Sequence, residues 1–303
     1  MKNKYIKSLS FLRLAAKVFP LKSKLNILIS KYLYIEGDLV IPYSDGFSIV
    51  LKPESVATST LNHLVFEGAT YLPEFTLLNK IKLKLGKDFV AIDVGANIGT
   101  IIWQLAKDCK HIFAFEPIPK LNRIIEHSCI YNAFDRLTIL KKAVGNMPGV
   151  VTMVDNDNSS IIDATSLNSI EVEVTTLDIA LDYLEKIDFI KIDVEGFEWN
   201  VLQGARRLIN QHKPILLLEL HPLYLQNYGV DYNQVINFIE SINYKIEYYS
   251  FMVEARKGKI MRLISRYFPN KGHRFINRVA FSKDTEKLPS ILSYHLYCEY
   301  NVA

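Results

Sequence analysis

Short apolar runs alternate with segments of helical periodicity from residue 89 onward. The runs cover residues 89–94, 111–115, 137–144, 189–194 and 215–220. Each run is continuously apolar rather than alternating, which is typical of strands that are buried on both faces of a parallel sheet. The pattern therefore predicts an α/β fold in which a doubly wound sheet is covered by helices on both faces.

The segments between these runs predict the remaining elements. Two alternating stretches, 149–154 and 171–175, are expected to pair as an antiparallel insertion. Residues 244–251 predict a further strand. The apolar spacing predicts helices over residues 100–107, 120–132, 178–184, 199–210 and 232–242.

The first third of the chain has a different pattern. Residues 1–36 predict one or two helices interrupted by Pro20, and residues 54–86 also have helical character. Between them, residues 39–51 predict a hairpin that turns at Ser44-Asp45-Gly46. We therefore expect a small helical and hairpin cap over residues 1–86, followed by the α/β domain over residues 87–303.

Composition excludes several classes of protein. The 303 residues are 49% hydrophobic and 22% charged, which excludes disorder. The three cysteines have no metal-ligand spacing, so neither a disulfide scaffold nor a cysteine zinc site is expected. No apolar run reaches the roughly 18 residues of a membrane span, and no signal peptide pattern is present. These features predict a cytoplasmic protein, which could also rest on the inner face of a membrane.

The charge is concentrated in two segments. Residues 1–36 and 251–278 each hold eight Lys or Arg and one acid, which leaves −10 for the rest of a chain of net charge +4. Both segments also have apolar residues at helical spacing, so they could bind anionic lipid or a phosphorylated ligand, or could be solvated faces of ordinary helices. Because the rest of the chain is acidic and has no groove-reading motif, we expect no nucleic acid partner.

The most informative motif follows the first run. Asp93-Val94-Gly95-Ala96-Asn97-Ile98-Gly99 joins a predicted strand to a predicted helix. Glycines there permit a tight turn and a close approach of the backbone to a ligand, at the strand end where open α/β sheets bind ligands. Glu116 ends the next run, where a carboxylate can accept hydrogen bonds from both ribose hydroxyls. The combination indicates a nucleoside-containing cofactor.

The loop departs from the nicotinamide pattern Gly-x-Gly-x-x-Gly. Asn97 stands where the second glycine would be expected, so a pyrophosphate would lose its close contact with the backbone. The carboxylate of Asp93 would also repel a pyrophosphate. A cofactor that carries an ammonium and a sulfonium but no phosphate suits this loop better, which favours S-adenosylmethionine.

Further motifs accompany the loop. They are Phe115-Glu116-Pro117-x-Pro119, Asn132, Leu177-Asp178, Ile190-Lys191-Ile192-Asp193-Val194-Glu195-Gly196-x-Glu198, Leu202-x-Gly204-Ala205 and Glu219-x-His221. With these motifs, roughly residues 71–251 resemble the FkbM-type S-adenosylmethionine-dependent methyltransferases. Family members often have an upstream Tyr-Glu pair; here Tyr71 is followed by Leu72-Pro73-Glu74, so Glu74 is not assigned to the cofactor.

The resemblance implies a Rossmann-like, seven-stranded class I methyltransferase sheet. It also implies methyl transfer to oxygen, often a hydroxyl of a saccharide or a natural product, with a small molecule or a glycan- or lipid-linked compound as acceptor. We expect the cofactor to be bound by residues of the loop and of the following strand ends: Asp93, Gly95, Asn97, Gly99, Glu116 and Ala143.

Four polar residues are the candidates for catalysis. Asp193 and Glu195 lie on one face of the fourth run and point toward its carboxyl edge, while Glu219 and His221 end the fifth run at the same edge. Removal of a hydroxyl proton needs a base whose pKa is close to the operating pH. His221 is the first candidate for that base, with Asp193 or Glu195 as the alternative and Glu219 orienting the base or binding the acceptor.

Other polar residues are assigned different roles. Lys191, on the same strand face as Asp193, is expected to neutralise Asp93 or Asp193 rather than to act in catalysis. Asp178 is expected to be a helix N-cap rather than a ligand. The histidines outside the motifs are expected to be surface or packing residues: His63, His111, His127, His212, His273 and His295.

Metal assistance and two other functions stay open. Asp193, Glu195 and Glu219 could supply oxygen ligands for Mg²⁺, but the spacing does not require an ion and no metal site is assigned. A nicotinamide-dependent oxidoreductase would use a related sheet. A non-catalytic scaffold associated with a membrane or a glycan would leave the cofactor motifs without a role.

Overall fold

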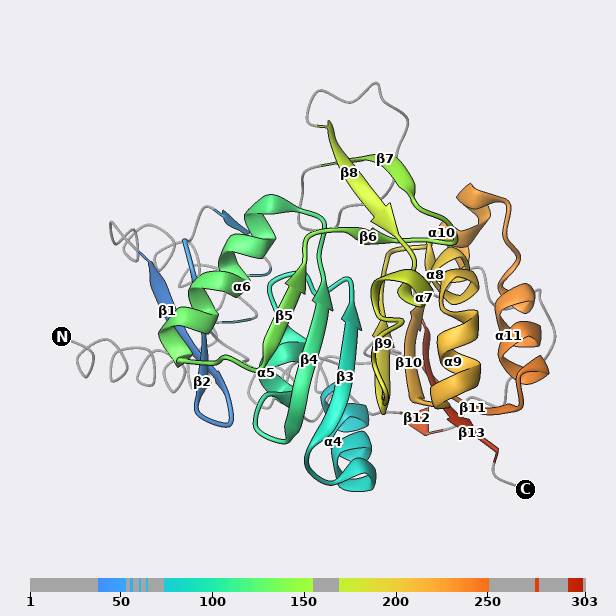
Figure 1. Cartoon of the computed structure of the whole chain (residues 1–303), viewed down its shortest axis with the longest axis horizontal. Coiled ribbons are helices and arrows are strands. Elements are labelled where there is room, and N and C mark those ends of the chain that lie inside the picture. Colours follow the sequence, from blue (N-terminus) through green and yellow to red (C-terminus); the bar gives the residue numbers. More distant parts are fainter. Residues whose placement is uncertain are drawn as a thin grey trace, which may run out of the picture.

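The computed structural model describes residues 38–52, 74–154, 169–250, 276–277 and 294–301, with 55–56, 60 and 64 between the first two ranges. Its centre is a sheet with the strand order β12-β11-β13-β10-β9-β3-β4-β5 (Figure 1). Apart from the two-residue β12, seven strands of the described part form this sheet, so the expected seven-stranded α/β sheet is confirmed. The strands are β3 (Phe89–Val94), β4 (Cys109–Phe115), β5 (Leu137–Leu140), β9 (Phe189–Ile192), β10 (Ile215–Leu220), β11 (Tyr244–Ser250), β12 (Ile276–Asn277) and β13 (Tyr294–Tyr300).

Strand direction determines where a ligand can bind. β5, β4, β3, β9 and β10 are parallel, whereas β13 pairs antiparallel with both β10 and β11. The chain starts the sheet at β3 and then places β4 on one side and β9 on the other. This reversal makes a switch point, and the crevice at the carboxyl ends of β3, β4 and β9 is where such sheets bind ligands.

Two hydrophobic cores cover the two faces of the sheet. In β3, Ala91 packs into one core and Ile92 into the other; in β10, Leu217 and Leu216 divide in the same way. This division explains why the strands are continuously apolar. The helices of the first core are α4 (Glu74–Leu85), α5 (Thr100–Leu105) and α6 (Pro119–Asn132). Those of the second are α7 (Leu177–Ala180), α8 (Glu198–Gly204), α9 (Arg206–His212), α10 (Pro222–Leu225) and α11 (Tyr232–Ser241).

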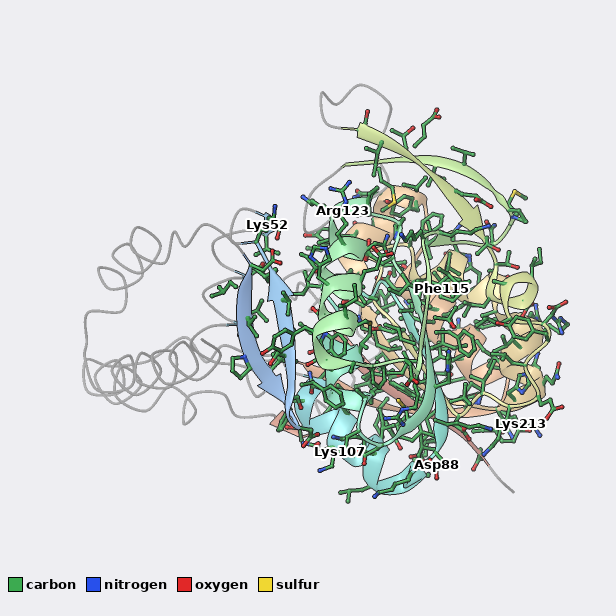
Figure 2. All side chains as sticks on the ribbon, turned by 60° about the vertical axis from the view of Figure 1, so that its left-hand side comes forward. Lys52, Asp88, Lys107, Phe115, Arg123 and Lys213 are labelled. Atoms are coloured by element: carbon green, nitrogen blue, oxygen red, sulfur yellow. The ribbon has the colours of Figure 1, made fainter. Side chains whose placement is uncertain are left out.

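The predicted hairpin is confirmed as β1 (Leu39–Ser44) and β2 (Phe47–Leu51). It lies beside α6, as Figure 2 shows, and contributes Ile41 and Ile49 to the first core. Side chains of α6 form hydrogen bonds with backbone groups at the edge of β2. Asn132 accepts from the Ser48 N–H at 2.9 Å and donates to the Ser48 carbonyl at 2.7 Å, and Ser128 accepts from the Val50 N–H at 2.8 Å.

A second sheet lies above the carboxyl ends of the large sheet (Figure 1) and consists of β6 (Ala143–Val144), β8 (Ser169–Thr175) and β7 (Gly149–Val154). The predicted antiparallel pairing of 149–154 with 171–175 is confirmed. The prediction of a single strand over 137–144 is wrong, because the chain leaves the large sheet after Leu140. Ala143 and Val144 pair with β8 instead.

Two predicted helices differ in the structure. The helix predicted over 178–184 ends at Ala180, and the Thr176 hydroxyl rather than Asp178 caps it. Asp178 instead accepts from the Arg207 and Leu208 N–H groups at the start of α9. The helix predicted over 199–210 is two helices, α8 and α9. The break follows Gly204, where a Cβ would lie 2.0 Å from the Gly145 carbonyl oxygen, so the chain packs there without a side chain.

Some predictions concern residues outside the described part. These are the helices of residues 1–36, most of the 54–73 stretch, and the basic segment 251–278 apart from Ile276–Asn277. None of the helices in the described part of the chain combines the length and the apolar character that a bilayer crossing requires.

Candidate active site

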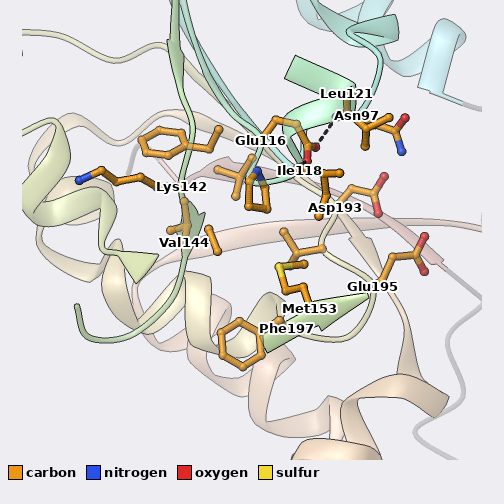
Figure 3. A pocket seen from close by; sticks show the side chains of 16 residues that line it. Asn97, Glu116, Ile118, Leu121, Lys142, Val144, Met153, Asp193, Glu195 and Phe197 are labelled. Carbon is orange, nitrogen blue, oxygen red and sulfur yellow. Dashed lines mark hydrogen bonds between the residues drawn. The ribbon is translucent and has the colours of Figure 1, made fainter. Parts of the chain in front are cut away.

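A pocket opens at the carboxyl ends of β3, β4 and β9, under the small sheet (Figure 3). Four residues expected to bind the cofactor line it, and so do Asp193 and Glu195. The expected residues Asp93 and Gly99 are not among the lining residues. The lining consists of Val94, Gly95, Asn97, Phe115, Glu116, Pro117, Ile118, Leu121, Lys142, Ala143, Val144, Met153, Asp193, Val194, Glu195 and Phe197.

The glycine loop is held against its neighbours by backbone contacts. Gly95 has a φ of 80°, and a Cβ on it would lie 1.9 Å from the backbone oxygen of Asp193. The N–H groups of Gly95 and Ala96 both donate to the carbonyl of Phe115 at 3.0 Å. Only glycine fits between β3, β4 and the end of β9, which is why the loop has a glycine at this point.

Glu116 joins the loop to the next strand end. Its two carboxylate oxygens accept from the Asn97 and Ile118 N–H groups, both at 2.8 Å. Figure 3 shows its carboxylate close to Asn97 in the pocket wall. Burial raises the pKa of Glu116 to about 7, against the lowering effect of the two N–H donors. The carboxylate is thus fixed in orientation at the place expected for ribose recognition.

Asp93 is fully buried beneath the loop. Lys191 lies between two carboxylates, with its Nζ 3.0 Å from Asp193 Oδ2 and 3.9 Å from Asp93 Oδ1, as its expected neutralising role requires. Within the described part of the chain, neither carboxylate oxygen of Asp93 has a hydrogen-bond partner. Burial raises the pKa of Asp93 to about 6 even though Lys191 opposes the shift. A buried carboxylate with unused acceptor capacity favours a cationic ligand.

His221 is surrounded by acids. Its Nδ1 lies 2.8 Å from Glu198 Oε1, and its Nε2 lies 3.5 Å from Glu195 Oε2 and 3.7 Å from Glu219 Oε1. Burial alone would lower the pKa of His221, but Glu198, Asp193 and Glu195 raise it to about 9. The imidazole therefore carries a proton at neutral pH. Its side chain caps no helix, although Pro222 starts α10 directly after it.

Glu195 occupies an unusual backbone conformation. Its φ is 53°, a backbone angle that residues other than glycine rarely adopt. Residues in such conformations are concentrated at functional sites. The side chain is 29% exposed, so it can meet a ligand from solvent. Burial and the neighbouring Asp193 raise the pKa of Glu195 to about 7, in spite of the opposing His221. Of the candidate catalytic groups, Glu195 thus has a pKa close to neutral pH.

Sequence analysis assigned neither Glu74 nor His295 to this network. His295, expected at the surface or in packing, is 1% exposed, and its Nε2 lies 3.3 Å from Glu219 Oε2 and 3.4 Å from Glu74 Oε1. His295 lies on β13, a strand that was not predicted. A signal for that strand exists in Tyr294–Tyr300, which is rich in the aromatic residues that sheets favour.

Two triads of side chains could offer atoms to a metal ion. In the described part these are Asp193, Glu195 and His221, and Glu74, Glu219 and His295, with ligand atoms within 4.8 Å of one another. In the second triad, His295 lies at ion-pair distance from both Glu74 and Glu219. In the first, His221 pairs with Glu195, while Asp193 pairs with Lys191. Because these ion pairs account for the clusters, we assign no metal to either.

The fold and the site define a class of protein. A seven-stranded sheet with an antiparallel last strand, a glycine loop after β3 and a carboxylate at the end of β4 define a class I methyltransferase. The Methyltransferase FkbM domain family matches residues 93–246, half of the chain. The chain therefore belongs to the FkbM methyltransferase domain family, and the expectation of a methyltransferase is confirmed.

Two of the solved structures that match the chain are distant from it in sequence. Methyltransferase FkbM from Methylobacillus flagellatus KT is 21% identical, with a TM-score of 0.42, over 64% of this chain and 52% of that chain. The match thus spans about half the length of the Methylobacillus protein. An rRNA methylase from Streptococcus thermophilus is 8% identical, with a TM-score of 0.44, over 76% of this chain and 98% of that one. No protein of curated function matches the chain.

Proposed function

We propose that the protein is an S-adenosylmethionine-dependent O-methyltransferase that acts on a hydroxyl of a saccharide, glycolipid or natural-product acceptor. The observation that carries the proposal is the excess of carboxylates around the pocket. In the described part of the chain three acids, Glu116, Asp193 and Glu195, and one cation, Lys142, line the pocket. Behind the lining lie four more acids, Glu74, Asp93, Glu198 and Glu219, with three cations, Lys191, His221 and His295.

This charge balance supports S-adenosylmethionine over a phosphorylated cofactor. The ligand's ammonium and sulfonium would compensate the surplus of carboxylates, whereas a pyrophosphate would add to it. Glu116 lines the pocket with its carboxylate held in place for ribose hydroxyls, and Asp93, buried behind the loop, adds negative charge that would attract a cationic ligand at a distance. Gly95, Asn97 and Ala143, which line the pocket, would complete the cofactor site, and Gly99 would act only by shaping the loop. Bound there, S-adenosylmethionine would supply a methyl group that is already activated for transfer.

Glu195 is the residue that we propose as proton acceptor. A hydroxyl that is methylated must lose its proton, and a base works best when its pKa is close to the operating pH. With a pKa of about 7, Glu195 meets this condition. His221, with a pKa of about 9, is protonated at neutral pH and cannot accept a further proton. His221 would then orient Glu195 through their 3.5 Å contact rather than act as the first base.

The exposed carboxylates support a polyhydroxylated acceptor. The side chains of Asp193 and Glu219 are 24% and 18% exposed, beside Glu195, and each can accept hydrogen bonds from neighbouring hydroxyls. Tyr224 stacks on His221 with ring centroids 5.6 Å apart and is 41% exposed, so it adds an aromatic face at the mouth of this region.

Methyl transfer can be tested without knowing the acceptor. The purified protein would be incubated with methyl-labelled S-adenosylmethionine and separate pools of reducing sugars, nucleotide sugars and glycolipids. We expect label in one pool, in a product heavier by one CH₂ whose new bond resists base, as an ether does and an ester does not. Label in amines or esters, or in the protein alone, would contradict O-methylation of a hydroxyl.

The two basic segments support a lipid-linked acceptor as part of the proposal. Residues 1–36 and 251–278 each carry a net charge of +7 and apolar residues at helical spacing. Flotation with vesicles of phosphatidylglycerol tests the idea. We expect the protein to float at low salt and to lose the vesicles at about 0.5 M salt, where screening is nearly complete. If the protein does not float with the vesicles at low salt, the proposed contact with anionic lipid is refuted.

A further inference from the structure

Glu219 and His295 are direct partners across two neighbouring strands. The antiparallel register of β10 and β13 sets their Cα atoms opposite each other, so both side chains project from the same face of the sheet. His295 Nε2 lies 3.3 Å from Glu219 Oε2, and the other oxygen, Oε1, lies 3.7 Å from His221 Nε2. The two oxygens of Glu219 are thus divided between two imidazoles.

A third element closes the arrangement. Glu74, the first residue of α4, brings its Oε1 to 3.4 Å from the same Nε2 of His295. Glu74 and His295 are 6% and 1% exposed, so neither reaches a ligand from solvent. Glu219 is more exposed than either, at 18%, and lies one residue before the end of β10, within 3.7 Å of His221. Of the two partners of His295, Glu219 is therefore the one that solvent and a ligand can reach.

Electrostatics explains why a histidine stands at this position. Two buried carboxylates next to each other repel and would resist ionisation together. A protonated imidazole between them compensates both charges at once. The other charged groups that face Glu219 are His221 directly after its own strand, Lys191 on β9 and Glu195 after β9.

We propose that His295 is a positioning residue, which holds the Glu219 carboxylate ionised and divided between β13 and His221, at the acceptor end of the site. The inference rests on the proposed function, because it assigns Glu219 to that end of a methyltransferase site. Burial alone would lower the pKa of His295, but Glu219 and Glu74 raise it to about 10. Burial would likewise raise the pKa of Glu219, and contact with His295 brings it below its usual range.

The test measures the ionisation of Glu219 directly. The side-chain carboxyl ¹³C resonance of Glu219, assigned with Glu219→Gln, would be followed against pH in EDTA-treated wild-type protein and in His295→Gln. We expect the titration midpoint of Glu219 to rise by at least one pH unit in His295→Gln, which is a tenfold change in its acid dissociation constant. The exposed His127 provides the matched control, and His127→Gln should leave the midpoint unchanged.

A second variant keeps the test possible if His295→Gln does not fold. His295→Gln leaves Glu74 and Glu219 buried without the cation between them, so it could unfold the protein. The double variant Glu74→Gln/His295→Gln removes one charge of each sign and should fold. Its Glu219 midpoint should lie between those of the wild type and the single variant, or above the wild type if the single variant does not fold. A Glu219 midpoint equal to that of the wild type in the double variant would overturn the proposal.

Cofactor binding and turnover separate this inference from the proposed function. A folded wild-type protein that binds no S-adenosylhomocysteine would refute the proposed function, while the ¹³C titration would still decide the coupling of His295 to Glu219. With an acceptor in hand, His295→Gln should lower kcat at least tenfold and leave the KM for S-adenosylmethionine within threefold. The acidic limb of its kcat profile should move to higher pH. A loss that is equal at every pH would indicate only a structural role and would contradict the proposal.

Discussion

Gly95 and Asp193 contact each other so closely that a single added methyl group would not fit. A Cβ on Gly95 would lie 1.9 Å from the backbone oxygen of Asp193, at a backbone φ of 80° that favours glycine. The contact joins the loop after β3 to the end of β9, and it therefore couples the cofactor loop to the residues proposed for the acceptor.

Gly95→Ala should lose both stability and cofactor binding. Overpacking and an unfavourable φ together cost about 3 kcal/mol of unfolding free energy, and the displaced loop would carry Asn97 and Glu116 with it. Gly149 is the matched control, since a Cβ there meets nothing within 4 Å. Urea unfolding should show a loss for Gly95→Ala and less than about 1 kcal/mol for Gly149→Ala. Equal stability of the two variants would disprove the close contact.

The stability of the protein should fall as pH rises from about 6 to 10. His221 has a pKa of about 9 in the folded protein against an ordinary value of 6.5, so its contribution is complete below pH 6.5 and is lost as pH rises through 9. The raised pKa values of Asp93 and Glu116 act in the same direction between pH 4 and 7. For His221 the shift corresponds to a contribution on the order of 3 kcal/mol.

His221→Gln tests this assignment. The variant should be less stable than the wild type at pH 6.5, because Glu198 keeps a buried carboxylate without its imidazolium partner. Its unfolding free energy should also change less than that of the wild type between pH 6.5 and 9. Urea titrations at several pH values measure both quantities. Parallel pH profiles for the two proteins would show that His221 does not carry the raised pKa.

Cofactor affinity should rise with pH in the acidic range. In the free protein Asp93 and Glu116 have pKa values of about 6 and 7, so both are partly protonated at pH 5.5. A ligand that binds their ionised forms releases those protons, and its affinity grows until both groups are ionised. We expect the Kd of S-adenosylhomocysteine to fall about a hundredfold from pH 5.5 to 7.5, about fourfold from Asp93 and about twenty-fivefold from Glu116. Calorimetry in two buffers of different ionisation enthalpy measures the released protons, and a Kd that is flat over this range would contradict the assignment.

Glu195→Gln should separate chemistry from binding. The substitution keeps the size of the side chain but removes the group proposed to take the hydroxyl proton, and general base catalysis contributes about 10²–10⁴-fold. We expect kcat to fall at least a hundredfold while the Kd of S-adenosylhomocysteine changes less than threefold. Glu240→Gln, on the exposed face of α11, is the control and should keep full turnover. If Glu195→Gln keeps full turnover, another group must take the proton.

Much of the sheet could be predicted from the sequence because its strands are buried on both faces. Residues 89–94 and 215–220 are strands with the predicted bounds, since two cores require apolar side chains on both faces of the sheet. The strand pattern was misleading over 137–144, where an apolar run continues while the chain crosses to the small sheet. Local apolar pattern carries no information about which sheet a strand joins.

The candidate site was predicted where motifs are local and missed where contacts are distant. Gly95, Asn97, Glu116 and Ala143 lie within short stretches of sequence and do line the pocket. His295 and Glu74 are 221 residues apart in the sequence, and only the antiparallel register of β13 brings His295 to Glu219. The role of His221 as a base was inferred from residue type, whereas its pKa depends on Glu198, whose contact comes from the start of α8.

The central claim is that the pocket with Glu116 in its wall and Asp93 buried behind it binds S-adenosylmethionine, and calorimetry tests it most directly. Wild-type protein, Asp93→Asn/Glu116→Gln and the surface control Glu126→Gln would each be titrated with S-adenosylhomocysteine and, separately, with NADH. The account predicts micromolar binding of S-adenosylhomocysteine by the wild type and the control, a loss of at least a hundredfold in the double variant, and no binding of NADH. Binding of NADH by the wild type, or equal binding of S-adenosylhomocysteine by all three folded proteins, would contradict it.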